Sequence, residues 1–367
     1  MSFSHPLVAR HLFGPGPGNP YPEATAALGL PLLGHLDPAF LTLMDETCDR
    51  LREVWGTQNR RTLPISATGS AGMEAAFVNT VEPGDVVVVG VNGLFGHRMC
   101  DVAARCGAEV VRVDFPWGTP VDPQALADAH PNPKIIAAVY AETSTGVQSD
   151  IAALGALKGD ALLVVDAVTA IGGIELLADE WGIDVGYAGT QKCLGVPPGL
   201  APFTISERAW ERRNEKPQSW YLDLGLLGGY LDSDGSGGGR TYHHTAPTAM
   251  VASLHAGLGR ILAEGLDTVI ARHAAAGQLL QDGLQEMGLE LFAQEGARLP
   301  DLTTVKVPEG VDSAAVRGEL LERFNIEIGA GAGEFAKTVW RIGLMGPNAA
   351  PDSALLVLSA LKDVLGR

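Results

Sequence analysis

The sequence has few cysteines, and they form no pattern that would hold the fold together. Among 367 residues only four are cysteine, namely Cys48, Cys100, Cys106 and Cys193. None belongs to a Cys-x-x-Cys pair of the kind that binds zinc. A chain of this length buries enough apolar surface to fold without disulfides. We therefore expect no disulfide framework, no metal site and a reducing location, the cytoplasm.

Long apolar runs and an excess of positive charge are also missing. No run approaches the 18 apolar residues of a membrane-spanning helix, and the N-terminus has no basic stretch followed by an apolar core. Lys and Arg number 26 against 43 Asp and Glu, which gives a net charge of −17. Such a charge opposes attraction to nucleic acid and to anionic lipid. We expect neither nucleic acid nor a membrane among the partners.

What the chain does contain is typical of an ordinary globular protein. Hydrophobic residues make up 46% and charged residues 19%, unlike the composition of a disordered chain. Glycine is abundant, with 46 residues, but lacks the three-residue period of collagen. We expect the extra glycines in turns, at close backbone approaches and in ligand-binding loops.

Short β-branched runs alternate with helix-like stretches from about residue 70 to residue 206. This alternation is typical of parallel strands joined by crossover helices. The runs 135–139 and 161–165 are apolar throughout, so both faces of these strands must be covered. The pattern predicts an α/β fold with a buried, mostly parallel sheet. The expected strands are Val86–Val89, Glu109–Asp114, Ile135–Tyr140, Ala161–Asp166, Val185–Ala188 and Phe203–Ser206.

The pattern changes after residue 206. The glycine-rich stretch from Gly225 to Gly239 indicates an irregular connection. From Thr248 to Met287 the periodicity predicts one long helix or a helical pair. The remainder predicts a smaller α+β domain. Its expected elements are strand Thr303–Val307, helix Ser313–Phe324, strand Val339–Ile342 and helix Ser353–Leu365.

Two ionisable residues stand at the ends of predicted strands. Asp166 ends an apolar strand, and Lys192 lies just beyond the next one. Because ligands bind at strand ends in open α/β sheets, both side chains are expected to face one crevice. On these two residues alone, a buried ion pair or two solvated loop residues explain the pattern equally well.

A turn of small residues, 66–70, opens a predicted helix with the sequence Ser-Ala-Thr-Gly-Ser. Free backbone N–H groups at a helix N-terminus, with hydroxyls and a glycine beside them, can bind phosphate. The turn lacks the lysine of a nucleotide P-loop. Taken alone, an ordinary serine-capped helix is the simpler interpretation.

The combination is more informative than either feature. A phosphate cradle, a carboxylate and a lysine at strand ends of one sheet are the three contacts that pyridoxal 5′-phosphate requires. The phosphate anchors the cofactor, the carboxylate keeps the ring nitrogen protonated, and the lysine bonds to the cofactor covalently. No nicotinamide or nucleotide site uses all three contacts.

Further motifs agree with this hypothesis, and with them the sequence resembles the class V aminotransferases of fold type I. Within that class it is most similar to the alanine–glyoxylate and serine–glyoxylate (serine–pyruvate) aminotransferases. The resemblance runs from Gly14 to Leu344, nearly the whole chain. The matching motifs are Asn92-Gly93-Leu94-Phe95-Gly96, Glu142-Thr143-Ser144-Thr145-Gly146-Val147, Val165-Asp166-Ala167-Val168, Gln191-Lys192 with Pro197-Pro198-Gly199, Tyr242-His243-His244-Thr245, and Arg341-Ile342-Gly343-Leu344.

The resemblance implies a domain organisation. It places an N-terminal segment over the active site at 1–20 and a large cofactor-binding α/β domain at 21–260. That domain would hold a mostly parallel, seven-stranded-type sheet. A smaller C-terminal α+β domain would cover 261–367.

The resemblance also implies roles for individual residues around the cofactor. Lys192 would bond to it and move the catalytic proton, and Asp166 would pair with its ring nitrogen. Phe95 would stack on one face of the ring, where the family often has Trp, and Val168 would pack on the other. Thr143 would hydrogen-bond at the ring edge.

The remaining roles concern the phosphate and the substrate. Ser70 stands where relatives can carry His, although a hydroxyl still donates to phosphate. Arg341 would bind the substrate α-carboxylate, because a guanidinium fork matches a carboxylate. Tyr242 and Thr245 would reach the phosphate of the neighbouring subunit in a homodimer with shared active sites. The phosphate-binding residues of the same chain would be Thr68, Gly69, Ser70 and Gln191.

The adjacent pair His243 and His244 raises the question of a metal site. Neighbouring residues of an extended segment point to opposite faces, and no third ligand lies close in sequence. We therefore expect no metal at this pair.

The resemblance implies a ping-pong transfer of an amino group from alanine or serine to glyoxylate or pyruvate. Ureidoglycine–glyoxylate transamination, or another small donor, remains an alternative. A same-fold lyase such as a cysteine desulfurase is less favoured, because it needs a mobile cysteine late in the chain and none follows Cys193. The presence of Lys192, Asp166 and Arg341 argues against a non-catalytic interaction subunit. A dicarboxylate donor would call for a second cation, and no second arginine matches a family motif.

Overall fold

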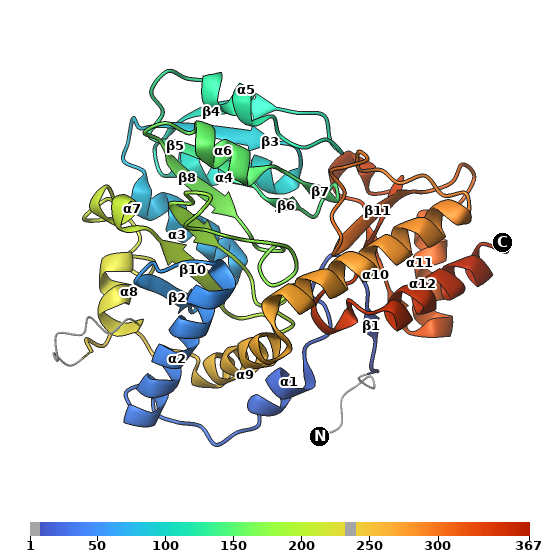
Figure 1. The fold of residues 1–367 in the computed structure, drawn as a ribbon, viewed down its shortest axis with the longest axis horizontal. Helices are drawn as coiled ribbons and strands as arrows, with labels where there is room; N and C mark the ends of the chain where they lie inside the picture. The colour runs from blue at the N-terminus through green and yellow to red at the C-terminus, as the bar shows by residue number, and fades with distance from the viewer. Residues whose placement is uncertain (1–7, 232–239) are drawn as a thin grey trace.

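A computed structural model describes residues 8–231 and 240–367, and its centre is a seven-stranded sheet (Figure 1). Only β10 runs antiparallel to its neighbours; the other strands are parallel to one another. This confirms the expected α/β class with a mostly parallel sheet. In spatial order the strands are β2 (Arg61–Ile65), β10 (Ala201–Ile205), β9 (Val185–Tyr187), β8 (Leu162–Asp166), β5 (Ile135–Val139), β3 (Val86–Val91) and β4 (Glu109–Asp114).

The strands at the middle of the sheet are buried on both faces. Every residue of β5 and β8 is buried, as the continuous apolar runs predict. The sequence analysis missed β2, whose Arg61 and Pro64 interrupt the apolar pattern. Because β2 is an edge strand that pairs only with β10, it tolerates a proline that cannot donate to a second neighbour.

Helices cover the sheet, and several begin at a side chain that caps them. Asp37, Asp122, Asp150 and Ser206 each accept a hydrogen bond from a backbone N–H of the helix that follows. The helices of this part are α1 (Pro22–Ala27), α2 (Pro38–Trp55), α3 (Gly69–Thr80), α4 (Leu94–Arg105), α5 (Pro123–Asp128), α6 (Ile151–Leu157), α7 (Glu207–Glu211), α8 (Leu224–Leu231) and α9 (Thr248–Glu264).

The prediction of an irregular connection from Gly225 to Gly239 is wrong for its first part. Residues 224–231 form α8, which buries Leu227 and Tyr230. The carboxylate of Asp223 accepts from the N–H of Gly225 at 2.8 Å and starts the helix despite its glycines. Residues 232–239 lie outside the described residues.

The region from Thr248 to Met287 is a helical pair, one of the two predicted forms. Gly265 separates α9 from α10 (Leu266–Glu286). In Figure 1, α9 lies under the large sheet, and α10 leads away from it to the smaller domain.

The C-terminal part forms a small antiparallel sheet packed against helices. The two strands and two helices that the sequence predicts for this part are confirmed to within two residues at each end. Trp340 is fully buried in the hydrophobic core between this sheet and its helices. The elements are β11 (Leu302–Lys306), β14 (Val339–Gly343) and β13 (Gly329–Ala330), helices α11 (Ser313–Phe324) and α12 (Pro351–Val364), and 3-10 turns η1 (Gly333–Phe335) and η2 (Gly346–Asn348).

The described residues form two main hydrophobic cores. The larger surrounds the seven-stranded sheet and includes Val269 of α10, whereas the smaller includes Ala276 of the same helix. One helix therefore joins both cores, and the expected boundary at residue 260 stays a prediction.

The N-terminal segment joins the two parts of the molecule. Strand β1 (His11–Leu12) pairs in parallel with β12 (Ile326–Glu327) of the smaller domain. Further on, the N–H of Gly18 donates to the carbonyl of Gln191 at 2.9 Å, and the N–H of Tyr21 donates to that of Gly195 at 2.7 Å. The segment thus runs from the smaller domain to the loop that carries Lys192. Over the two described ranges, no helix is long and apolar enough to cross a membrane.

Candidate active site

A cavity of about 210 Å³ lies beyond the ends of the parallel strands and gathers most of the predicted site residues. Its walls come from the start of α3, from α4, from the residues after β8 and from the loop after β9. Asp166 and Lys192 both line it, as the shared-crevice interpretation predicts. The lining residues are Thr68, Gly69, Ser70, Met73, Phe95, Arg98, Asp166, Val168, Gln191 and Lys192.

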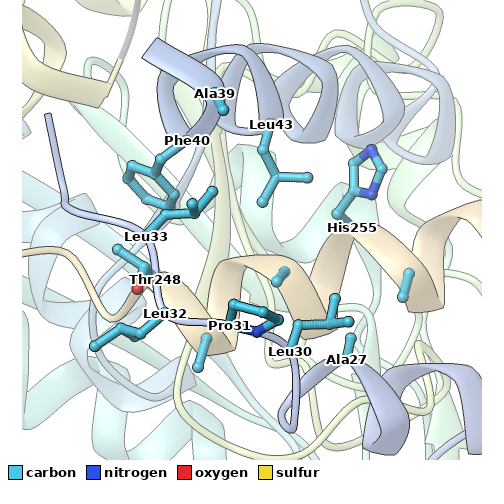
Figure 2. A pocket seen from close by; sticks show the side chains of 13 residues that line it. Ala27, Leu30, Pro31, Leu32, Leu33, Ala39, Phe40, Leu43, Thr248 and His255 are labelled. Atoms are coloured by element: carbon cyan, nitrogen blue, oxygen red, sulfur yellow. The ribbon is translucent and has the colours of Figure 1, made fainter. Parts of the chain in front are cut away.

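A second hollow, of about 300 Å³, lies between α1, α2 and α9 and is lined by apolar side chains. Figure 2 shows Phe40 and Leu43 pointing from α2 toward the segment that carries Leu30 and Leu32. None of its lining residues belongs to the first cavity. The first cavity, with its charged groups, is therefore the candidate active site.

Asp166 is the last residue of β8 and its carboxylate is buried in the cavity wall. The side chain is only 3% exposed, and Oδ1 accepts from the N–H of Val168 at 2.9 Å. Burial, with a smaller contribution from the charge of Glu142, raises its pKa from 3.8 to about 7. A cation bound beside it would offset this cost, so the site fits a ligand with a protonated ring nitrogen.

Lys192 is also buried, and its amine contacts the carbonyl oxygen of Pro15 in the N-terminal segment. Burial lowers its pKa from 10.5 to about 8. A lysine in this state supplies the neutral amine that attacks a carbonyl group. At Gly16, with φ of +105°, a Cβ atom would lie 2.6 Å from Nζ of Lys192. Only glycine allows the segment to lie this close to the amine.

The start of α3 has the form that phosphate binding requires. Thr68 precedes the helix in an extended conformation, and its side chain does not cap it. The hydroxyl therefore stays available to a ligand beside the first N–H groups of the helix. Oε1 of Gln191 is buried without a hydrogen-bond partner. A buried polar atom of this kind indicates that a ligand completes the site.

Glu142 supports the residues around the cavity, although its motif indicated no role for it. It is fully buried, and its Oε2 accepts from the N–H of Phe95 at 3.0 Å. Its Oε1 accepts from the N–H of Ser144 at 3.0 Å and from the hydroxyl at 2.6 Å. The carboxylate therefore fixes the start of α4, where Phe95 lies, and the turn that contains Thr143.

Arg98 lines the cavity and was also missed. Its Nη1 donates to Oγ of Ser70 at 3.2 Å, and its guanidinium carbon lies 4.9 Å from the centre of the Phe95 ring. The signal in the sequence is its spacing, because residues three apart on a helix share a face.

Arg341 and Thr143 lie together but do not line the cavity. Arg341 stands on β14 of the small domain, where its Nε donates to the carbonyl of Ala330 at 2.6 Å. Its Nη1 donates to the carbonyl of Thr143 at 3.3 Å. Burial lowers the pKa of Arg341. The predicted substrate-binding arginine is thus anchored to the turn that Glu142 holds.

Tyr242 and Thr245 do not reach the cavity of their own chain. Tyr242 is 55% exposed and Thr245 is exposed, and their hydroxyl oxygens lie 3.4 Å apart. Both side chains therefore stand on the surface rather than in the site of the same subunit.

The argument that His243 and His244 point apart is wrong. Their Nδ1 atoms lie 2.8 Å apart, because the segment does not belong to a strand. Nε2 of His244 lies 2.6 Å from Oγ of Ser66, and burial, followed by the charge of His243, lowers the pKa of His244 to about 4. Among residues 8–231 and 240–367, no group of three His, Cys, Asp or Glu side chains could hold a metal ion.

Comparison with known proteins identifies the family. Residues 23–339 match the model of the aminotransferase class-V family. An alanine–glyoxylate aminotransferase of Drosophila melanogaster is 40% identical over 369 residues, which cover 98% of this chain and 93% of that protein. The (S)-ureidoglycine–glyoxylate transaminase of Bacillus subtilis (strain 168) is 38% identical over 378 residues, covering 98% and 91% respectively.

A solved structure agrees with this family match. The crystal structure of an alanine–glyoxylate aminotransferase from Nostoc sp. superposes with a TM-score of 0.95 at 45% identity, covering 100% of this chain and 97% of that one. The resemblance that the motifs carry is therefore confirmed over almost the whole chain. With Lys192 and Asp166 buried in one cavity of this fold, the chain belongs to the class-V aminotransferases.

Proposed function

We propose that this aminotransferase uses pyridoxal 5′-phosphate to transfer the amino group of alanine or serine to glyoxylate or pyruvate. One observation carries the proposal, namely that a buried carboxylate and a buried lysine meet in one cavity at a helix N-terminus. The relatives named for alanine, ureidoglycine and glyoxylate support the small-substrate class.

The residues around the cavity suit the parts of this cofactor. When bound, pyridoxal phosphate supplies a cationic ring that withdraws electrons from the substrate carbon bearing the amino group. Asp166 would hold the ring nitrogen, and Lys192 would bond to the cofactor. Phe95 and Val168 would cover the two ring faces, and Thr143 would contact the ring edge. The residues proposed for the phosphate are Thr68, Gly69, Ser70 and Gln191.

The chain's own chemistry centres on Nζ of Lys192. Burial keeps its pKa near 8, so the neutral amine is accessible close to neutral pH. We propose that this amine takes the proton from the α-carbon of the donor and, in the second half-reaction, supplies a proton to the α-carbon of the acceptor. The N-terminal segment, which touches the amine through the Pro15 carbonyl, would limit access of water.

The positions of the arginine side chains indicate how many carboxylates the substrates carry. Arg341 would bind the α-carboxylate with its guanidinium fork. Arg98 bonds to Ser70 at the start of α3, so it stands at the phosphate end of the cavity and not beside Arg341. A donor with one carboxylate is therefore favoured over a dicarboxylate. Ureidoglycine remains the second candidate donor, because a transaminase named for it is 38% identical.

A cysteine desulfurase activity finds little support. The thiol nearest the site in sequence, Cys193, is fully buried, and its Sγ donates to Oδ2 of Asp301 at 3.2 Å. Burial raises the pKa of this thiol well above its ordinary value. A thiol held in this way does not supply a mobile nucleophile.

We further propose that the protein works as a homodimer in the cytoplasm. The exposed hydroxyls of Tyr242 and Thr245 would complete the phosphate site of the partner subunit. Leu30 and Leu32 are 61% and 80% exposed, and exposed leucines in one segment favour burial against a second chain. His35, at the end of this segment, lies 5.2 Å from the Tyr242 ring.

The test is reconstitution of the purified protein with pyridoxal phosphate. We expect a visible absorbance band from the lysine-bound cofactor and amine transfer from alanine or serine to glyoxylate or pyruvate. Lys192→Ala should lose both. Lys306→Ala removes a surface lysine that pairs with Glu290 and should leave both unchanged. A wild-type protein that stays colourless, or that transfers no amine from a panel including ureidoglycine, would contradict the proposal.

A further inference from the structure

We propose that Arg98 is the fixed cation that binds the cofactor phosphate and makes the protein select the phosphorylated form of the cofactor. The ligand group is a phosphate monoester dianion. The inference rests on the proposed function, in which the cavity holds pyridoxal phosphate.

The position of Arg98 is fixed from two sides. On one side its Nη1 bonds to Oγ of Ser70, the second residue of α3, at 3.2 Å. On the other its guanidinium lies over the Phe95 ring, 4.9 Å from the centroid, and Phe95 is one turn earlier on α4. The guanidinium therefore stands at the start of α3, where the helix N-terminus attracts anions.

The charge of Arg98 is not neutralised by the protein. Its hydrogen bond goes to a hydroxyl, and it forms no ion pair with a carboxylate within residues 8–231 and 240–367. Of the described residues that line the cavity, only Arg98 and Lys192 carry a positive side chain. Lys192 is needed for the covalent bond to the cofactor. Arg98 is therefore the cationic side chain of this lining that can pair with the phosphate dianion.

The chemistry of the guanidinium also explains Ser70. Oγ of Ser70 accepts from Arg98, so the hydroxyl proton remains free to donate to a phosphate oxygen. The planar fork of Arg98 has further N–H groups that can donate to the same phosphate. A serine beside this arginine thus provides a donor where relatives can carry a histidine.

The experiment compares two forms of the cofactor. Full-length cofactor-free protein is titrated with pyridoxal 5′-phosphate and, separately, with unphosphorylated pyridoxal, and both dissociation constants are measured by absorbance. We expect Arg98→Gln to weaken binding of the phosphorylated form by about 10- to 100-fold, the loss of a charge-assisted hydrogen bond. Its affinity for pyridoxal should stay unchanged.

Arg105→Gln is the matched control. Arg105 lies on the same helix, with 76% of its side chain exposed, and pairs with Asp101 on the surface. This variant should leave both affinities unchanged. Arg98→Lys keeps the charge but not the fork, and we expect its selectivity to lie between those of the wild type and Arg98→Gln.

Three results would overturn the inference. The first is an equal loss of both affinities in Arg98→Gln, which would indicate a role in the ring site or the fold alone. The second is an unchanged affinity for the phosphorylated form. The third is a ³¹P resonance of the bound cofactor in the wild type that titrates near pH 6, the ordinary value for a phosphate monoester that no cation holds. This measurement does not depend on whether Arg98→Gln folds. A wild type that binds neither form would instead remove the proposed function itself.

Discussion

At the scale of single residues, burial is the main reason that the pKa values of the two central groups of the site lie near neutral pH. Lys192 and Asp166 line one cavity, and burial is the largest cause of both pKa shifts. Burial therefore disfavours the charged form of each group, and a ligand that pairs with the carboxylate and bonds to the neutral amine would offset this cost.

The first prediction concerns Lys192. We expect cofactor-free protein to bond pyridoxal phosphate at a rate that rises with pH and is half-maximal near pH 8. Only the neutral amine attacks the aldehyde, and burial lowers the pKa from 10.5 to about 8. Stopped-flow absorbance over a pH series measures this rate. A midpoint near 10.5 would show that burial does not control the amine.

The second prediction concerns the stability of the cofactor-free protein. The carboxyl of Asp166 has its pKa raised from 3.8 to about 7, so the folded state binds more protons than the unfolded state in this window. Stability contributed by this group is therefore lost as the pH rises from about 4 to about 7. Asp166→Asn should raise the unfolding free energy at pH 8 by up to about 4 kcal/mol.

Thermal melts measure this effect, with an expected rise of a few degrees at pH 8. At about pH 4, where the wild-type carboxyl is already neutral in the fold, the two proteins should melt alike. With cofactor bound the order should reverse, since the variant has lost the charge that pairs with the ring nitrogen. Equal melting of both proteins at pH 8 without cofactor would contradict the prediction.

The sequence predicted the residues that a motif makes visible, but not all of those that support them. Thr68, Gly69 and Ser70 were found because a glycine-containing turn before a helix has a recognisable composition, and Gln191 because it precedes Lys192 in a family motif. All four meet in one cavity. Glu142 was not assigned a role, because its partner Phe95 becomes a neighbour only when β6 (Ala141–Glu142) lies against the start of α4.

At the scale of elements, segments with a clear strand or helix pattern between turn residues were easiest to predict. The predicted limits of Glu109–Asp114 and Ser313–Phe324 are identical to β4 and α11. Helix α8 was not predicted, because its glycines have a low intrinsic helix propensity and its stability comes from burial of Leu227 and Tyr230. Edge strand β2 was missed because tertiary pairing with β10 overrides its composition.

The third prediction tests how β6 and its partner strand β7 (Val147–Gln148) support α4. A Cβ atom at Gly93 would lie 2.4 Å from Cγ and Cδ of Glu142. Gly93→Ala should therefore displace that carboxylate, lower the unfolding free energy by about 1–3 kcal/mol and weaken cofactor binding through Phe95. Urea denaturation and cofactor titration measure the two effects.

Gly318→Ala is the control for this substitution. Gly318 lies in α11, and nothing lies within 4 Å of the position of its added Cβ. Alanine there should stabilise the protein by about 0.5–1 kcal/mol, because glycine has the lower helix propensity. If Gly93→Ala behaved in the same way, the close approach to Glu142 would not matter for stability.

At the scale of the whole molecule, the fourth prediction concerns shared active sites. We expect Lys192→Ala and the double variant Tyr242→Ala, Thr245→Ala each to lose most activity as homodimers. In a hybrid dimer, one site combines an intact Lys192 with an intact Tyr242 and Thr245 from the other chain. Mixing and re-equilibrating the two variants should restore about a quarter of wild-type activity. Activity no higher than the average of the two homodimers would contradict sharing.

The pairing of β1 with β12 has a consequence for the order in which the molecule folds. Arg10, just before β1, bonds to Asn325, which lies 315 residues further along the chain. The segment that contacts Lys192 is therefore synthesised before both domains, yet it finds its partner strand only after β12 has emerged. The large sheet can form earlier, since its neighbouring strands are closer in sequence. We infer that the N-terminal segment closes over the active site only after β12 is in place, and therefore later than the large sheet forms.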